Sequence, residues 1–143
     1  MGTMKMQVKK LCEVAKVPAY VHATDAGMDL FSVETIVILP QDRVQVHTGI
    51  AVAIPDGYVG LIWDKSGVSH NGGLKVMGGV IDAGYRGEIL VGMVNLSDAP
   101  YTINVGDKIT QMLIQKVEQP EIVEVETLTL GDRGAKGFGS TGI

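Results

Sequence analysis

The chain has 143 residues, of which 45% are hydrophobic but only 5% aromatic, and its formal net charge is −4 at pH 7. This length fits one domain that buries a substantial core without disulfides, and that core must be built from aliphatic residues and methionine. The acidic balance excludes a generally basic, nucleic-acid-binding surface, so an anionic ligand would need local Lys or Arg, backbone amides or a divalent cation.

A single cysteine, Cys12, allows no internal disulfide and is typical of a reducing compartment. The first ten residues are interrupted by Lys5, Lys9 and Lys10 and contain no apolar run like that of a signal peptide. No stretch approaches the roughly 20 apolar residues of a transmembrane helix. We therefore expect a soluble, cytoplasmic protein that binds neither nucleic acid nor membrane.

Short, β-branched segments separated by glycine and proline turns recur along the chain, which is typical of an all-β sandwich or barrel. One short helical turn is expected to begin at Ser66, whose hydroxyl could cap the amides that follow. The expected strands are, in chain order, 7–14, 35–39, 43–54, 58–63, 74–77, 88–96, 101–105, 107–117 and 121–128.

Residues 78–90 place one carboxylate, Asp82, and one aromatic ring, Tyr85, in a glycine-framed turn between two apolar segments. Residues 82–84 are expected to form a hairpin connection, with Gly84 at positive φ. The glycines would leave backbone groups open to a flat ligand edge, with Asp82 orienting a water or hydroxyl and Tyr85 lying against a ring. An ordinary β-turn with a solvated aspartate explains the segment equally well.

The segment 131–142 contains five glycines and few side chains that could fill a core. One interpretation is a disordered chain end. The other is a flexible anion-binding arm, because Arg133, Lys136 and the glycine amides can bind an anion. Phe138 could then close over a base, and such stacking is worth about 1–3 kcal/mol.

Three further segments carry weaker signals. Asp25 and Asp29 could hold a magnesium ion directly or through water, although surface acids are commoner. Lys65 and the residues after it could offer a cation, a hydroxyl and amides to a phosphate, or could simply end a strand. Gln111 lies near a strand start, where a structural role is the commoner one. The three histidines show no metal-ligand spacing and are assigned no catalytic role.

Taken together, five segments resemble the trimeric dUTP diphosphatases (dUTPases). These segments are AGMDL at 26–30, KSG at 65–67, GVIDAGYRG at 79–87, GDKITQM at 106–112 and RGAKGFGSTG at 133–142. The third and fifth are highly specific, and the resemblance covers residues 23–142. It implies a distorted jelly-roll-like β-barrel with one short helix, in a homotrimer with three active sites at subunit interfaces. A barrel domain would span residues 1–130, and a C-terminal arm, 131–143, would be exchanged between subunits and close over a neighbour's site.

The resemblance also implies the reaction: hydrolysis of dUTP to dUMP and pyrophosphate by water attack on the α-phosphorus, with Mg²⁺ as cofactor. Asp82 would orient and deprotonate the water, Tyr85 would pack on the deoxyribose, and Asp29 would help to hold Mg²⁺ through water. The other implied substrate contacts come from the hairpin, the phosphate-binding segments and the arm. They are Gly79, Val80, Ile81, Lys65, Ser66, Gly67, Gln111, Arg133, Phe138, Gly139, Ser140 and Thr141, with Phe138 covering the uracil.

The chain departs from the family pattern at three positions. Lys65 replaces the usual arginine and so lacks the bidentate guanidinium fork. Val76 stands where many members have a base-contacting asparagine, which shifts base recognition to main-chain groups. Gly84 occupies a position that is often acidic, and no effect is expected in a turn.

Two alternatives remain. The related dCTP deaminases share this fold but need an acidic residue on the strand after the hairpin, and residues 89–96 contain none. The second alternative is a non-catalytic trimer that serves as a binding or regulatory module. All the catalytic residue types of the family are present, which favours the enzyme, and a regulatory protein partner in addition stays open.

Overall fold

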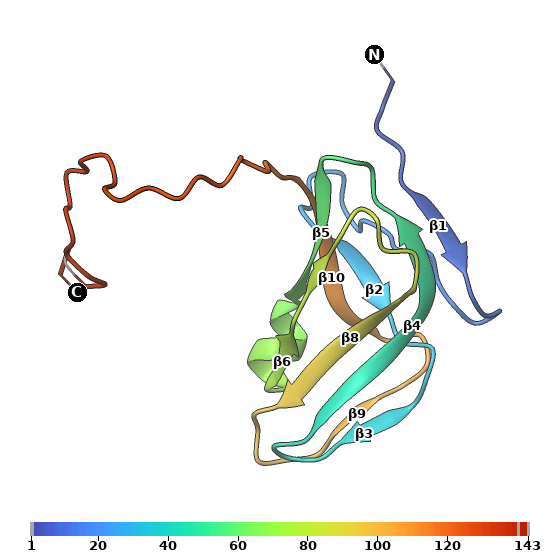
Figure 1. Cartoon of the computed structure of the whole chain (residues 1–143). Helices are drawn as coiled ribbons and strands as arrows, with labels where there is room; N and C mark the ends of the chain where they lie inside the picture. Colours follow the sequence, from blue (N-terminus) through green and yellow to red (C-terminus); the bar gives the residue numbers. More distant parts are fainter. Residues whose placement is uncertain (1, 140, 143) are drawn as a thin grey trace.

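The protein, described here as a computed structural model over residues 2–139 and 141–142, is built from antiparallel sheets. One four-stranded sheet has the order β1-β4-β8-β6, a second has the order β2-β10-β5-β7, and β3 pairs with β9 (Figure 1). The strands are β1 Gln7–Lys10, β2 Met28–Phe31, β3 Ile36–Ile38, β4 Arg43–Ala53, β5 Tyr58–Asp64, β6 Leu74–Met77, β7 Val80–Ile81, β8 Glu88–Asn95, β9 Tyr101–Ile103 and β10 Lys108–Lys116. The all-β, jelly-roll-like fold expected from the sequence is confirmed.

The core lies between the sheets and is aliphatic, as the composition requires. Every second residue of β8 is buried, so one face of that strand packs inward while the other stays partly open. The largest fully buried side chains come from strands of all three sheets and from the loop after β4, and they are Leu30, Ile38, Val46, Ile50, Ile54, Leu74, Ile89, Val91, Met93, Ile103, Ile109 and Met112.

The connection between β6 and β8 differs from the expected tight hairpin. These two strands are antiparallel partners, but β7 lies in the loop between them and pairs with β5 of the other sheet. The expectation of positive φ at Gly84 was wrong. Gly78 and Gly79 have φ of 70° and 112° instead. At Gly79 a Cβ would lie 2.8 Å from the carbonyl oxygen of Ile62, so only glycine lets the chain cross between the sheets here.

The short helix forms where it was expected, as the π-helix Gly67–Asn71 (η1), but Ser66 makes no side-chain cap hydrogen bond. The main-chain amide of Ser69 donates instead to the Lys65 carbonyl at 2.9 Å. The strand β2 was not predicted from the sequence, because Asp29 in this segment was considered only as a possible magnesium ligand.

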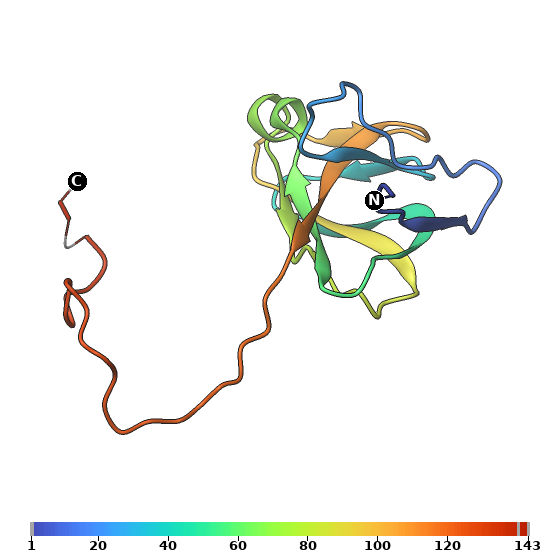
Figure 2. The same ribbon diagram turned by 90° about the horizontal axis from the view of Figure 1, so that it is seen from above.

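The strand expected over residues 121–128 was wrong. The segment contains no strand and all its residues are exposed. Its apolar residues alternate with glutamates in a strand-like way, but a strand needs a hydrogen-bonding neighbour, and the described residues offer this segment none. After Val117, whose amide donates to the Gly57 carbonyl, every residue up to 139 is exposed. Two perpendicular views show this segment leading away from the sheets (Figures 1 and 2). None of the helices in the described part of the chain is long and apolar enough to cross a membrane.

Candidate functional site

Asp82 and Tyr85 lie at the surface, in the loop that links β7 to β8. The amide of Tyr85 donates to the Asp82 carbonyl at 3.1 Å and closes a turn. The Tyr85 hydroxyl donates to the Glu88 main-chain oxygen at 2.8 Å, which fixes the ring while 43% of the residue stays exposed. A Cβ on Gly87 would lie 2.5 Å from that hydroxyl, so the ring needs glycine at this position. The loop therefore presents an exposed carboxylate beside a fixed aromatic ring.

A cavity of about 260 Å³ opens beside this loop. Its lining combines the carboxylate and the ring with apolar side chains from β7 and β8, and consists of Gln45, Val80, Ile81, Asp82, Tyr85, Glu88 and Leu90. A few polar groups in an apolar hollow are typical of small-molecule sites. The expected hairpin residues Val80, Ile81, Asp82 and Tyr85 thus share one cavity.

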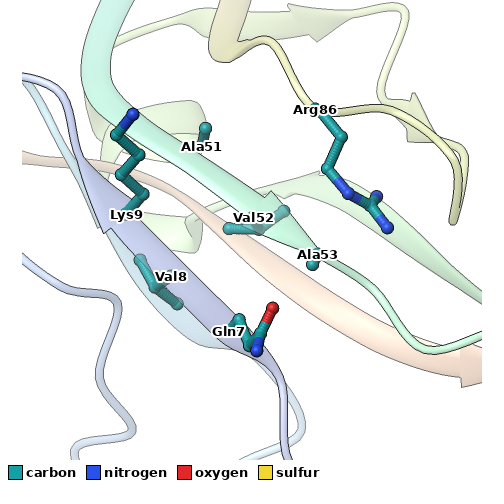
Figure 3. Close-up of a pocket in the computed structure, with 7 residues that line it drawn as sticks. All are labelled: Gln7, Val8, Lys9, Ala51, Val52, Ala53 and Arg86. Carbon is teal, nitrogen blue, oxygen red and sulfur yellow. The ribbon is translucent and has the colours of Figure 1, made fainter.

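Another cavity, of about 340 Å³, lies between β1, β4 and Arg86 (Figure 3). The Arg86 guanidinium is held within its own loop, because it donates to the carbonyls of Ala83 and Tyr85. None of the seven lining residues carries a carboxylate or hydroxyl group. This cavity therefore lacks the groups needed to activate water.

A second group of expected site residues gathers where β2, β10 and β5 run side by side. Gln111 of β10 lies opposite Asp29 of β2 and Trp63 of β5. The Lys65 ammonium donates to Asp29 Oδ1 at 2.5 Å, and the Gln111 side chain donates to the Asp64 carbonyl at 2.8 Å. Ser66 and Gly67 follow Lys65 directly and are exposed.

Lys108 joins this group; it lies within the family-like segment 106–112, but no role was predicted for it. Its Nζ lies 3.1 Å from Asp29 Oδ2 but off the direction of a hydrogen bond, so the contact is an ion pair. A bulge in β10 between Lys108 and Thr110 shifts the side-chain alternation, so that Lys108 and Gln111 both lie on the face of Asp29. A bulge of this kind could not be read from the residue pattern.

Asp29 is held ionised by these neighbours. Burial to 4% exposure raises the pKa of its carboxyl, but the pairing of the carboxylate with both Lys65 and Lys108 outweighs burial, and the pKa falls below its ordinary value. One carboxylate between two ammonium groups leaves a net positive charge at the end of β5. Such a cluster favours an anionic ligand in an otherwise acidic protein.

The carboxylates near this cluster suit a magnesium ion only through water, outside the inner coordination shell of the ion. Within the described residues, no group of three or more His, Cys, Asp or Glu side chains could hold a metal. Asp25, the other expected carboxylate, accepts the His22 amide in a local turn at 2.9 Å. Asp29 is ionised, but both its oxygens face lysines. It therefore fits a water-mediated contact with an ion whose inner ligands are phosphate oxygens and water.

The expected arm residues lie apart from both groups in the single chain. Phe138 is fully exposed, and Gly139 and Thr141 are exposed as well. Arg133 donates to the Gly137 carbonyl within the arm, at 2.8 Å. Ser140 lies outside the described residues. The chain alone thus presents the predicted residues in three separate places.

The strand register also separates the first two places. Val80 pairs with Leu61 and Ile81 with Gly60, so the antiparallel chain carries Asp82 towards Val59, while Lys65 follows the opposite end of β5. Six residues of strand correspond to roughly 20 Å. The triphosphate of one nucleotide is much shorter than this. One chain therefore cannot bring Asp82 and Lys65 onto the same triphosphate.

Comparisons with known proteins agree on one family. The family model for dUTPase matches residues 13–142. The deoxyuridine 5'-triphosphate nucleotidohydrolase of Thermobifida fusca is 45% identical over 99% of this chain and 80% of its own length, and that of Clostridium kluyveri is 43% identical over 97% and 99%.

Solved structures show the same likeness. The Staphylococcus bacteriophage 80alpha dUTPase with dUpNHpp has a TM-score of 0.94 and 37% identity, over 99% of this chain and 100% of that one. A mutant dUTPase from phage phi11 of S. aureus, described with a structural Mg(II) ion, has a TM-score of 0.83 and 36% identity, over 87% and 99%.

Proposed function

The chain belongs to the dUTPase family, and we propose that it is a dUTP diphosphatase, which hydrolyses dUTP to dUMP and pyrophosphate. The observation that carries the proposal is the exposed carboxylate of Asp82 next to the fixed ring of Tyr85, at a cavity lined by β7. The site's carboxylate, aromatic ring and remote cationic cluster are the groups that a nucleoside triphosphate requires.

In the proposed reaction, Asp82 orients a water molecule and accepts its proton. The water oxygen forms a bond to the α-phosphorus, and the bond from that phosphorus to the bridging oxygen of the β-phosphate breaks. The pyrophosphate leaves with the electron pair, and the proton on Asp82 returns to solvent. A carboxylate base suffices because pyrophosphate is a good leaving group.

The nucleoside would lie against the loop that carries Asp82. Tyr85 packs on the deoxyribose and leaves no space for a 2′-hydroxyl, and the uracil lies along the main chain at Gly79, Val80 and Ile81. The Gly79 carbonyl already accepts the Ile62 amide at 2.7 Å, which fixes the main chain at this position, and Val80 next to it is exposed. A stiff backbone slot also excludes the methyl group of thymine. The arm residues Phe138 and Gly139 would cover the base from the other side.

The phosphates would lie at the cationic cluster. Lys65, Gln111 and the exposed segment Ser66–Gly67 contact the phosphate chain, and Arg133, Ser140 and Thr141 of the arm contact the terminal phosphate. Magnesium, when bound with the nucleotide, neutralises charge that develops on the phosphate oxygens. Asp29 would hold it through water.

A homotrimer completes the site. The roughly 20 Å between Asp82 and Lys65 along the strand supports a site that takes its nucleoside-binding loop from one copy and its phosphate-binding cluster from another. The resemblance to the family implies three copies. The body would span residues 1–130, and the arm, 131–143, would close over a neighbour's site. The exposure of its described residues, 131–139 and 141–142, supports that exchange. The single free cysteine, Cys12, is exposed, which suits the reducing cytoplasm.

Product analysis tests this function. The protein is incubated with Mg²⁺ and, separately, dUTP, dCTP, dTTP, dATP and dGTP, while pyrophosphate and ammonia are measured. We expect pyrophosphate from dUTP alone and ammonia from none. Ammonia from dCTP would support the deaminase alternative instead. Absence of pyrophosphate from dUTP would contradict the proposal.

A regulatory function is a second candidate. Phage dUTPases, represented by the 80alpha protein, are described as controlling transfer of virulence genes, and the 80alpha fold matches this chain with a TM-score of 0.94. We propose that a regulatory protein partner would bind independently of hydrolysis. A pull-down partner that binds wild type and Asp82→Asn equally would support it, and a partner lost with Asp82→Asn would contradict it.

A further inference from the structure

Asp29 is shared by two lysines that differ in how they contact it. Lys65 donates a hydrogen bond to Oδ1, whereas Lys108 lies 3.1 Å from Oδ2 without hydrogen-bond alignment. Oδ2 is buried and has no hydrogen-bond partner. A buried carboxylate oxygen without a donor is uncommon, since each such atom carries a desolvation penalty. The cluster therefore holds one satisfied and one unsatisfied acceptor, each beside its own cation.

Substrate binding would disturb this arrangement. Under the proposed function, Lys65 contacts the phosphate chain, yet in the free protein its ammonium is bound to Asp29. When Lys65 turns towards a phosphate, Oδ1 loses its donor. A carboxylate that is 4% exposed cannot replace that donor with bulk water, so an uncompensated charge would remain.

Lys108 is the other cation within ion-pair distance of Asp29 in the described part of the chain. Its side chain is 47% exposed and so has room to move, and the acceptor it faces is free. A small rotation of its ammonium would turn the ion pair into a hydrogen bond to Oδ2.

We propose that Lys108 is a positioning residue, which holds Asp29 in place when Lys65 leaves it for the triphosphate. The inference rests on the proposed function and adds to it a residue that acts through Asp29. It predicts that loss of Lys108 affects the free protein less than the triphosphate complex, because Lys65 still donates to Asp29 in the free protein. The defect emerges only when a triphosphate draws Lys65 away.

Calorimetric titration with two ligands tests this. The ligands are dUpNHpp, which carries the phosphate chain, and deoxyuridine, which lacks it, both with Mg²⁺. The variants are Lys108→Met and the conservative Lys108→Arg. Lys116→Met is the matched control, because Lys116 is exposed at the far end of the same strand.

We expect Lys108→Met to weaken dUpNHpp binding about tenfold, as for one lost charge-assisted hydrogen bond, and to leave deoxyuridine binding unchanged. Lys108→Arg should restore most of the affinity for dUpNHpp, and Lys116→Met should match wild type. The thermal midpoint of free Lys108→Met should lie close to that of Lys116→Met, since Lys65 still donates to Asp29. A merely structural lysine would instead lower the midpoint and leave the ratio of the two affinities unchanged.

Unchanged dUpNHpp affinity in Lys108→Met, an equal loss for deoxyuridine, or a Lys108→Met protein that does not fold would each overturn the inference. Wild-type protein that binds neither ligand would overturn the proposed function, and the inference with it. Wild-type binding together with an unaffected Lys108→Met variant would overturn the inference alone.

Discussion

The hydroxyl of Tyr85 donates a 2.8 Å hydrogen bond to the main-chain oxygen of Glu88, and this bond bridges Gly87. The Glu88 carboxylate in turn accepts the Gly49 amide at 3.1 Å and lies 3.0 Å from His47 Nδ1. The ring that is proposed to bind the sugar is thus anchored through Glu88 to β4. The hydrogen bond between Tyr85 and Glu88 requires that residue 87 has no side chain.

Replacing Gly87 with alanine should displace the Tyr85 ring. The new Cβ would lie 2.5 Å from the tyrosine hydroxyl, and the hydroxyl would lose its acceptor. We expect KM for dUTP to rise about tenfold, as for one lost hydrogen bond and its ring contact, with a smaller change in kcat. Gly84→Ala is the control in the same loop, because a Cβ there meets nothing within 4 Å. Equal kinetics for the two variants would contradict the role of Gly87.

Asp82→Asn should abolish most turnover and preserve binding. The amide is of similar size but cannot accept the proton of the attacking water, and a general base contributes about 10²- to 10⁴-fold to the rate. Pyrophosphate release measures turnover, and calorimetry with dUpNHpp measures binding. Asp98→Asn, at an exposed carboxylate elsewhere, should resemble wild type. Turnover that survives Asp82→Asn would exclude this residue as the base.

Removing residues 133–143 should reduce turnover roughly 100-fold or more, because the uracil would lose the ring of Phe138 and the phosphates would lose the charge of Arg133. The fold should be unaffected because residues 118–139 are exposed. Circular dichroism and size-exclusion chromatography report the fold and the assembly. An unfolded truncation would show that the arm belongs to the core.

Phe138→Ala isolates the stacking contribution within the same arm. We expect a rise in KM of about tenfold, and Leu130→Ala, at another fully exposed apolar residue, serves as the matched control. The same KM for both variants would indicate that the phenyl ring does not cover the base.

Acidification should remove the stabilising contribution of Asp29. Burial raises the pKa of Asp29, but Lys65 and Lys108 outweigh burial, so the folded protein has a pKa below the ordinary 3.8. The unfolded chain binds the proton first as the pH falls. The stability that Asp29 contributes is therefore present above about pH 5 and is lost as the pH falls through 3.8 towards the folded value.

Asp29→Asn tests this linkage through urea unfolding at pH 7 and pH 3. At pH 7 the variant should lose on the order of 1–3 kcal/mol, less than for a fully buried pair, because both lysines are partly exposed. The loss should shrink at pH 3. Asp98→Asn should change stability at neither pH. A loss of the same size at both pH values would contradict the assignment of the lowered pKa.

The residue pattern predicted most strands because turn residues and β-branched runs act locally. The strand 74–77 was predicted with the observed bounds. The strands predicted to begin at residues 43, 58 and 88 also begin there in the structure. The errors arose where a strand depends on a distant partner. Residues 121–128 have a strand-like composition but no pairing neighbour among the residues that the structure describes. β7 leaves the expected hairpin because β5 offers its free edge.

The sequence alone determined the family and the chemical types at the site, since the order of Asp29, Lys65, Asp82 and Gln111 and the glycine-rich arm are properties of the chain itself. Only the tertiary structure decided which of these groups meet. The register of β7 on β5 sends Asp82 and Lys65 to opposite ends of a strand, and a bulge in β10 turns Lys108 towards Asp29. Both results depend on hydrogen-bond pairing between segments far apart in the chain, and no local residue preference specifies that pairing.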